Sequence, residues 1–490
     1  MIQPAEISFF ERISFWTLIR AAIVLTAPIG YAFTAARFAA FCIEYLFLNA
    51  VSAVTFLALA MSLNAPLRQL PACVVMIVFL ICYYLEFYLM VTFPWLIEFV
   101  PLPPNILGFS EQYYFACFCT MTAGLAAFAA VVIPWSRRLG RRRLDSRAGR
   151  PVRRFHAAPA LCAAGALAAG YLWFNLSYNI VNGGSVPVLA FHLFGVVEFS
   201  FSITATLLFL MIIDAATEQG DWRTAAFAAT IWLAPLFCTA FIITSKGAIF
   251  TFLLDLFFLW LLAAGRLNWR VLGLGILGFA TGAVLFPVIN AVRALRVDEG
   301  MSAGRAISVV LTGAGGMTTA IRDVGAGKGG AVLPSMIALI LGRLSGANTL
   351  LPIMELRYPF LGMNSFHIAM GTHGIPGYFT SQMLGLGDLT ASRLTAALGM
   401  LGFFWIIGGN AMVIVGVAGF TSMILAAWHF IPRHTGRSTR AAQVTLLMVV
   451  LGGAVDGSLQ QFVLHVLPFW AVSVALAEWI GRGGEVRRAA

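Results

Sequence analysis

Hydrophobic residues fill this chain in long runs that recur from one end to the other, and polar residues are concentrated in the segments between them. A helix needs about 20 mostly apolar residues to cross the hydrocarbon core of a bilayer. The pattern therefore predicts a single all-α, polytopic membrane domain over residues 1–490. We expect twelve membrane-spanning helices, at about residues 15–36, 39–62, 70–92, 114–135, 157–178, 189–213, 225–244, 248–265, 271–290, 406–429, 442–457 and 464–480.

The segment 291–393, between the ninth and tenth predicted spans, breaks this pattern because it is long and only partly apolar. It contains two short apolar stretches, 306–321 and 332–342, which glycine-rich sequence separates. Apolar stretches of about 10–14 residues are more often interfacial or re-entrant than spanning. We predict that 291–393 is one large loop with short interfacial or re-entrant helices, folded as a lid over a cavity at the outer face of the membrane.

The composition excludes an ordinary soluble protein. Hydrophobic residues make up 60% of the chain and charged residues 10%, whereas soluble domains carry about 45–50% and about 25%. All seven cysteines lie in apolar runs without a CxxC pair, so no disulfide framework is expected. The N-terminal sequence has no small-residue cleavage site after its apolar run, and we interpret it as a retained first helix.

Basic residues outnumber acidic ones by 31 to 20, and nine of the arginines lie in the loop 136–154. Positively charged short loops stay in the cytoplasm, so this loop sets the orientation and places both termini in the cytoplasm. The other cations agree, because the short outer loops then hold only Arg37 and Lys246. An arginine run between two spans favours this role over nucleic-acid binding, and no nucleic-acid partner is expected.

The long outer segment carries eight basic residues against five acidic ones, although a loop of this length is exempt from the orientation rule. Arginine binds phosphate through paired hydrogen bonds and a permanent charge. Arg293 and Arg296 are three residues apart and share one helical face, and Lys246 stands at a narrow helical hairpin. These cations suit a polyprenyl-linked pyrophosphate. The alternative is that they snorkel to lipid headgroups.

Histidines and acids of the outer segment are candidate bases for a reaction at a sugar hydroxyl. They are His367, His373, Asp323 and Glu355, and a structural role in hydrogen bonds or ion pairs is the alternative for each. No two His, Asp or Glu residues there have close ligand spacing, so no metal site is expected. Lys328 follows glycine-rich sequence but lacks the serine or threonine of a phosphate loop.

Six charged residues lie inside predicted spans, where a charge is costly and is usually functional. Two interpretations stay open, a proton or substrate path through the membrane and the pairing of charges between neighbouring helices. The six residues are Arg20, Glu44, Glu86, Glu198, Asp255 and Asp456.

Several short motifs lie between residues 240 and 425. They are Lys246-Gly247 at an outer hairpin, Arg343 in GRLSGANTLL, the segment GIPGYFTSQMLGLG and the closing LGMLGFFWIIGG. Arg293 and Arg305 are each followed by a glycine after ten intervening residues. In these motifs the chain resembles the Wzy-type O-antigen polymerases, the oligosaccharide repeat-unit polymerases of bacterial inner membranes. It departs from many members in showing one large outer loop where they have two.

The resemblance implies an inverting, metal-independent glycosyltransferase without a cofactor, in the bacterial inner membrane. Its substrate would be an undecaprenyl-pyrophosphate-linked oligosaccharide. The growing glycan would pass to the non-reducing sugar of another lipid-linked repeat unit, which extends O-antigen, capsule or exopolysaccharide at the outer leaflet. Membrane lipids and a chain-length regulator are its candidate partners.

The resemblance also suggests roles for individual residues. His373 or Glu355 would orient or deprotonate the acceptor hydroxyl. Two other functions stay open: a ligase that uses the same donor with a core-lipid acceptor, and a twelve-helix transporter or flippase, although the two halves of the sequence show no similarity to each other. The residues expected to bind the pyrophosphate are Lys246, Arg293, Arg305 and Arg343.

Overall fold

The structure is a computed structural model, and in the part of the chain that it describes every regular element is a helix. The all-α prediction is confirmed for these residues. The described residues are 15–64, 67–93, 110–141, 157–178, 180, 193–243, 247–264, 273, 275–278, 285, 288–289, 292–293, 295–296, 300–312, 346–355, 360–362, 364, 368, 398–435, 438–456, 459 and 462–482.

Most of the helices begin and end within a few residues of the predicted spans. The 3-10 turns η1 (Ala35–Arg37) and η2 (Ala39–Phe41) join the first two helices. The π-helical segments are η3 (Phe79–Leu85), η7 (Ser200–Ala205), η8 (Thr239–Ile243) and η9 (Phe462–Val466). The α-helices are α2 (Phe15–Thr34), α3 (Cys42–Ser62), α4 (Leu70–Val78), α5 (Glu86–Thr92), α6 (Glu111–Arg141), α7 (Ala157–Ser177), α8 (Leu193–Phe199), α9 (Thr206–Glu218), α10 (Trp222–Cys238), α11 (Gly247–Ala264), α13 (Ala303–Thr312), α16 (Ala347–Glu355), α19 (Gly399–His434), α20 (Thr439–Asp456) and α22 (Leu467–Arg482).

Among the described residues, eight helices are long and apolar enough to cross a membrane. Three shorter apolar helices, Ile249–Ala264, Thr439–Val455 and Leu467–Ile480, fall on three further predicted spans. The predicted span 271–290 is described only in part, and its described residues are helical. The eight are Ile19–Arg37, Ala39–Ser62, Leu70–Thr92, Glu111–Arg138, Ala157–Ser177, Val196–Glu218, Trp222–Phe241 and Gly399–Ile431.

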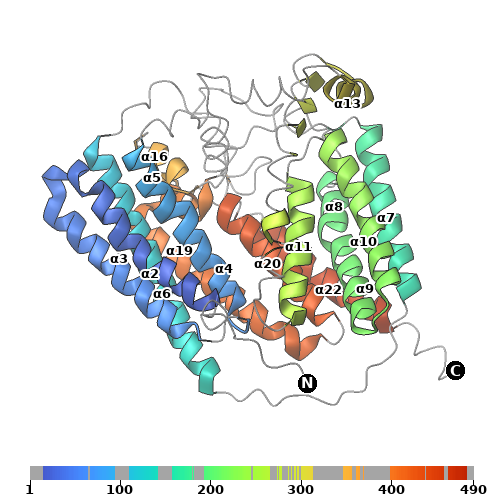
Figure 1. The fold of residues 1–490 in the computed structure, drawn as a ribbon, viewed down its shortest axis with the longest axis horizontal. Helices are drawn as coiled ribbons and strands as arrows, with labels where there is room; N and C mark the ends of the chain where they lie inside the picture. Colours follow the sequence, from blue (N-terminus) through green and yellow to red (C-terminus); the bar gives the residue numbers. More distant parts are fainter. Residues whose placement is uncertain are drawn as a thin grey trace, which may run out of the picture.

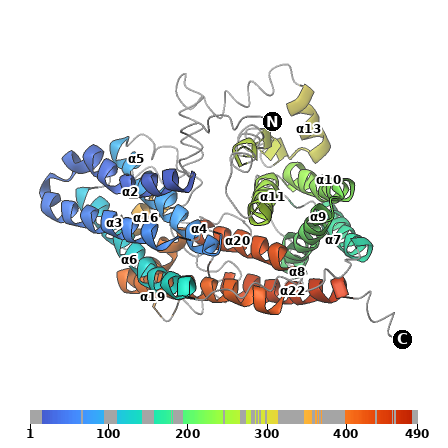
Figure 2. The same ribbon diagram turned by 60° about the horizontal axis from the view of Figure 1, so that its bottom comes forward.

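The helices form two groups, with α20 between them (Figure 1). The first group contains α2, α3, the continuous α4–η3–α5 helix, α6, α16 and α19, and the second contains α7 to α11 and α22 (Figures 1 and 2). Within the first group, α6 packs along both α3 and α19. A helix from the last quarter of the chain therefore completes a bundle that the first quarter begins.

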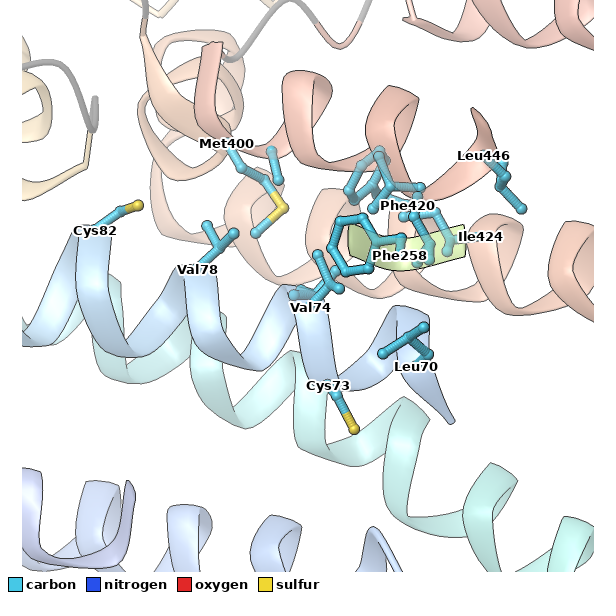
Figure 3. Close-up of a cluster of buried hydrophobic side chains, with 14 of the residues drawn as sticks. Leu70, Cys73, Val74, Val78, Cys82, Phe258, Met400, Phe420, Ile424 and Leu446 are labelled. Atoms are coloured by element: carbon cyan, nitrogen blue, oxygen red, sulfur yellow. The ribbon is translucent and has the colours of Figure 1, made fainter. Parts of the chain in front are cut away.

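Apolar side chains from four helices join the two groups (Figure 3). Phe258 of α11 lies beside Phe420 and Ile424 of α19 and close to Val74 of α4, and all four are buried. Leu446 of α20 is also buried in this region. Because lipid is as apolar as these side chains, close van der Waals packing rather than the hydrophobic effect stabilises such contacts within a membrane.

Outward-facing side chains of α2 and α3 are large and apolar. Phe33 is 69% exposed, Ile43 75%, Phe47 65% and Met61 67%. A soluble protein rarely leaves a continuous apolar surface of this kind uncovered. These exposed faces suit contact with lipid.

Polar side chains are paired inside the first group. The Tyr88 hydroxyl donates to Asn49 Oδ1 at 2.8 Å, and the hydroxyls of Thr34 and Tyr45 are hydrogen-bonded at 2.6 Å. Each such bond between helices in a membrane contributes on average about 0.6 kcal/mol. A second buried set consists of Ser52, Tyr84 and Thr122.

Two adjacent glycines interrupt α19. Gly408 and Gly409 have non-helical backbone angles, and Gly409, with φ +64° and ψ −154°, occupies a region that is open essentially to glycine alone. Just past the break, Asn410 Oδ1 accepts a hydrogen bond of 2.6 Å from the Thr120 hydroxyl of α6. The predicted span 406–429 therefore contains this break near its start, within a longer, discontinuous helix.

Residues of the segment 291–393 cover this break. The backbone N–H groups of Leu361 and Gly362 donate to the carbonyls of Ile406 and Ile407, at 3.0 and 2.9 Å. The break frees these carbonyls from the regular helical ladder, and in a membrane such groups need a partner within the protein. The ring of Phe360 lies over the second glycine, 2.9 Å from where a Cβ would stand.

The short helix α16 packs inside the first group, against α5, α6 and α19. Leu350, Leu351 and Ile353 are fully buried. The backbone at Gly346, just before α16, approaches the Cys82 carbonyl so closely that a Cβ would overlap it. α16 lies outside both apolar stretches from which short helices were predicted. Of those stretches, 306–321 begins within α13, and 332–342 lies outside the described residues.

Candidate functional site

An apolar cluster joins the elements at one end of the second group. Its buried residues come from η8, from the start of α11, from the helical residues between 285 and 296 and from α13. We call this cluster the outer junction, because the sequence predicts that its segments lie at the outer face of the membrane. Its members are Ala240, Phe241, Ile249, Val288, Ile289, Val292, Ala306 and Val310.

α13 lies on the outer junction, beyond the end of α10 (Figure 1). Ala306 and Val310 are four residues apart, so they share one helical face, and both are buried. Arg305, the residue before Ala306, is exposed. The backbone N–H of Met301 donates to the Leu295 carbonyl at 3.1 Å, which ties the start of α13 to the preceding helical residues.

Three of the predicted phosphate-binding cations belong to segments that converge here. Arg293 is partly buried, and Arg305 is exposed. Lys246 lies outside the described residues, but Phe241 and Ile249 on either side of it are both members of the outer junction. The fold therefore brings residues that are about 60 positions apart in the sequence to one end of the second helix group.

Arg296, one helical turn from Arg293, is buried, with 6% of its surface exposed. Burial lowers the pKa of this guanidinium from its usual value, yet arginine remains charged in proteins. The prediction that Arg293 and Arg296 share a helical face is consistent with the helical assignment of both residues. Their unequal burial shows that Arg293 is the more accessible of the two.

The described structure does not bring the other predicted site residues to the outer junction. Arg343, His367 and His373 lie outside the described residues. Glu355 is the last residue of α16, and its side chain also lies outside the description. α16 and α13 lie over different groups of helices in both views (Figures 1 and 2). Among the described residues, no group of three His, Cys, Asp or Glu side chains is arranged to hold a metal.

The charged residues inside the predicted spans differ in their contacts and their exposure. Arg20 donates to the Leu63 carbonyl at 2.7 Å and to Asn64 Oδ1 at 3.2 Å, so it links α2 to the end of α3. Glu44 and Glu198 are exposed on the outside of the helices. Arg20 thus makes polar contacts between two helices, whereas the two glutamates are not buried.

Two other intramembrane acids are buried. Glu86, at the start of α5, and Asp255, in the middle of α11, are each 1% exposed. The side chain of Asp456 lies outside the described residues. All seven cysteines are free, as expected from their spacing.

Sequence analysis missed an ionic contact at the other end of the second group. Arg440 of α20 binds Asp214 at 2.9 Å and Glu218 at 2.6 Å, both on α9. Nearby, Glu478 of α22 accepts hydrogen bonds from the backbone N–H and the hydroxyl of Ser438. The local sequence gives no sign of this contact, because the acidic partners of Arg440 lie more than 220 residues away in the sequence.

In its described part the chain is an all-helical protein with several helices that are long and apolar enough to cross a membrane. No family model, curated protein or solved structure matches it. The fold and the outer junction therefore define the class, a polytopic helical membrane protein with cationic segments gathered at one end.

Proposed function

We propose that this chain is a polysaccharide polymerase of the bacterial inner membrane, an inverting glycosyltransferase that works at the periplasmic face. The hydroxyl of a sugar on one lipid-linked repeat unit attacks the anomeric carbon of a growing glycan. The bond from that carbon to undecaprenyl pyrophosphate breaks, and the pyrophosphate leaves with the bonding electrons. The hydroxyl proton passes to a base of the protein.

The observation that carries the proposal is the convergence of three cationic segments on the outer junction. They are the hairpin that contains Lys246, the helical stretch with Arg293 and Arg296, and α13 with exposed Arg305. A departing pyrophosphate gains negative charge in the transition state, and fixed cations around it lower the barrier. The resemblance of residues 240–425 to repeat-unit polymerases supports the same reaction.

In this proposal the pyrophosphate binds to Arg293, Arg305 and Lys246, with Arg343 as a fourth cation from the same outer segment. Arginine forms two parallel hydrogen bonds to phosphate oxygens, while lysine acts as a point charge. His373 or Glu355 takes the proton from the acceptor hydroxyl. No metal is required, because the cations supply the charge that a metal would otherwise provide.

The proposed topology has twelve spans, made of the eight long helices, the three shorter apolar helices and the stretch 271–290. The arginine-rich loop 136–154 lies in the cytoplasm together with both termini, and 291–393 lies in the periplasm as a lid over the substrate. The last turns of α6, which lead into this loop, and the helix α13 lie on opposite sides of the molecule (Figure 1). This arrangement supports the proposed orientation.

The test is to incubate the purified full-length protein, in lipid nanodiscs, with undecaprenyl-pyrophosphate-linked repeat units and to separate the products on a gel. A ladder of longer glycans is expected from the wild type. Loss of one charged hydrogen bond to phosphate costs about 1.5–3 kcal/mol, so Arg305→Ala is expected to slow polymerisation about ten- to hundredfold.

Arg37→Ala is the matched control, because Arg37 is also an exposed arginine at the outer end of a helix, but on the first group. It is expected to leave the rate unchanged. A single addition to a core-lipid acceptor without a ladder would instead identify the ligase. Movement of a labelled lipid across the membrane, without any longer glycan, would identify a flippase and overturn the proposal.

A further inference from the structure

Asp255 is a buried acid near the middle of α11. It is 1% exposed, and neither of its carboxyl oxygens has a hydrogen-bond partner in the structure. The helix runs from Gly247 to Ala264, so at about 1.5 Å per residue the carboxyl lies about 12 Å from one end of α11 and about 13 Å from the other. It therefore lies far from either end of a helix that we assign to the membrane.

The side chains on this face of α11 are apolar or aromatic. Phe252, three residues before Asp255 and on the same helical face, meets Trp232 of α10 edge to face, with ring centroids 4.7 Å apart. Trp232 also stacks on Phe209 of α9. The indole Nε1 of Trp232 is itself buried without a hydrogen-bond partner in the structure. Two neighbouring helices thus each bury a polar group in the interior of this helix group.

The charges on the helices that pack against α11 do not neutralise Asp255. Among the described residues, α9, α10, η8 and α20 pack against α11, as do Gly275 and Gly278 and, through Phe258, α19. Arg440 of α20 is already bound by Asp214 and Glu218, and Arg223 is exposed at the start of α10. The charged or titratable residues on these elements are Asp214, Glu218, Arg223, Cys238, His429, Arg433, His434, Arg440 and Asp456.

An isolated carboxylate in apolar surroundings is far less stable than the neutral acid, because burial removes the water that solvates its charge. A metal ion would need several more oxygen ligands than one carboxyl supplies, and Phe252 and Trp232 provide none. We propose that Asp255 is a proton-binding site in the membrane interior, where the carboxyl holds its proton as a neutral acid enclosed by α9, α10, α11 and α20. Glycosyl transfer at the outer junction does not use this site, so the proposal goes beyond the polymerase function.

Infrared spectroscopy of the full-length protein, in a detergent without ester groups, tests this proposal. A protonated carboxylic acid has a C=O stretching band that is separate from the amide bands. We expect this band at neutral pH, a shift of the band when aspartate side-chain carboxyls carry carbon-13, and loss of the band in Asp255→Asn. Asp214→Asn is the matched control, because Asp214 is also buried but is ion-paired, and it should keep the band.

The isotope experiment needs no variant, so it stands even if Asp255→Asn fails to fold. A wild-type spectrum at neutral pH without a band that shifts on aspartate labelling would overturn the proposal. Loss of the band on addition of sodium at constant pH would also overturn it, because the site would then bind a metal cation. Polymerase activity has no part in either readout, so this proposal and the proposed function fail or succeed separately.

Discussion

Arg440 and its two acids illustrate how one residue can join distant parts of this chain. Asp214 has 8% of its side chain exposed, whereas Glu218 has 52% and Arg440 33%. The carboxylate of Asp214 depends on Arg440 more than that of Glu218 does, because burial has removed most of the water around Asp214. The pair of Arg440 with Glu218 is exposed, so solvent screens it. Of the two contacts, the one to Asp214 therefore stabilises the junction of α9 and α20 more strongly.

Arg440→Met is expected to destabilise the protein by about 2–3 kcal/mol, because it leaves a buried carboxylate without its cation. Thermal unfolding in detergent, followed by circular dichroism, measures the effect. Glu218→Gln is the control, and its cost should stay below about 1 kcal/mol, as for other exposed ion pairs. Equal losses for both variants would contradict the ranking of the two contacts.

The sequence identified single charged residues inside apolar runs, but it did not show which of them are buried. Asp255 in FTFLLDLFFLW is buried, whereas Glu44 in FCIEYLFL and Glu198 are exposed. The Arg440–Asp214 pair was not predictable, because a charge near a helix end has the same local sequence whether or not a distant acid meets it. Arg293 and Arg305 were identified as candidates from their cationic segment, but only the structure shows that one is partly buried and the other exposed.

At the scale of one element, α19 depends on the two glycines at its break. A side chain at Gly409 would meet two penalties, the strain of φ +64° with ψ −154° and a close approach to the Phe360 ring. Gly419, ten residues later in the same helix, has helical geometry and open space around its Cβ position. The two positions therefore separate backbone strain from the ordinary effect of alanine in a helix.

Gly409→Ala is expected to destabilise the protein by about 1–3 kcal/mol, the cost of holding a side chain in that backbone region. Gly419→Ala should be neutral or stabilise it by up to about 1 kcal/mol, because alanine favours a regular helix. The melting temperatures of both variants, compared with that of the wild type, measure these two effects. Equal changes in melting temperature for the two variants would show that the backbone at Gly409 accepts a side chain as readily as a regular helix does.

The elements differed in how far sequence could define them. The helix Leu70–Thr92 and the helix that ends at Ser62 match their predictions closely, because a long apolar run needs only local information. α16 was not predicted as a re-entrant helix. Its sequence, ANTLLPIME, is short and moderately apolar, and its burial depends on the space that α5, α6 and α19 leave open. That space is a property of the tertiary structure.

At the scale of the whole molecule, charge distribution and helix directions give a consistent orientation. The end of α22 and the end of α6 lie on the side of the molecule opposite to α13 (Figure 1). Residues 136–141 of the arginine-rich segment 136–154 form the end of α6, and the proposed topology places this whole side in the cytoplasm by the positive-inside rule. The orientation stays a prediction from charge, whereas the pairing of the two helix groups could not be predicted from the sequence.

Reporter fusions test this orientation. Alkaline phosphatase, which is active only in the periplasm, should be inactive when fused after Arg482 and active when inserted after Gly300, an exposed glycine with open space around it. Green fluorescent protein exported through the general secretory route does not fluoresce, so it should give the opposite pattern. The same reporter state at both sites would contradict the proposed arrangement of helices.

The packing of α6 against α19 also has a consequence for how the protein is made. Gly124 of α6 lies against Leu401, and Thr120 bonds to Asn410, but Gly399 emerges from the ribosome only about 260 residues after Arg141. At about 5–20 residues per second, this delay lasts roughly 10–50 s. Throughout that interval one face of α6 is already inserted and has no native neighbour. The first helix group is therefore the part of the nascent chain that most needs shielding by the insertion machinery, although it is the first to be synthesised.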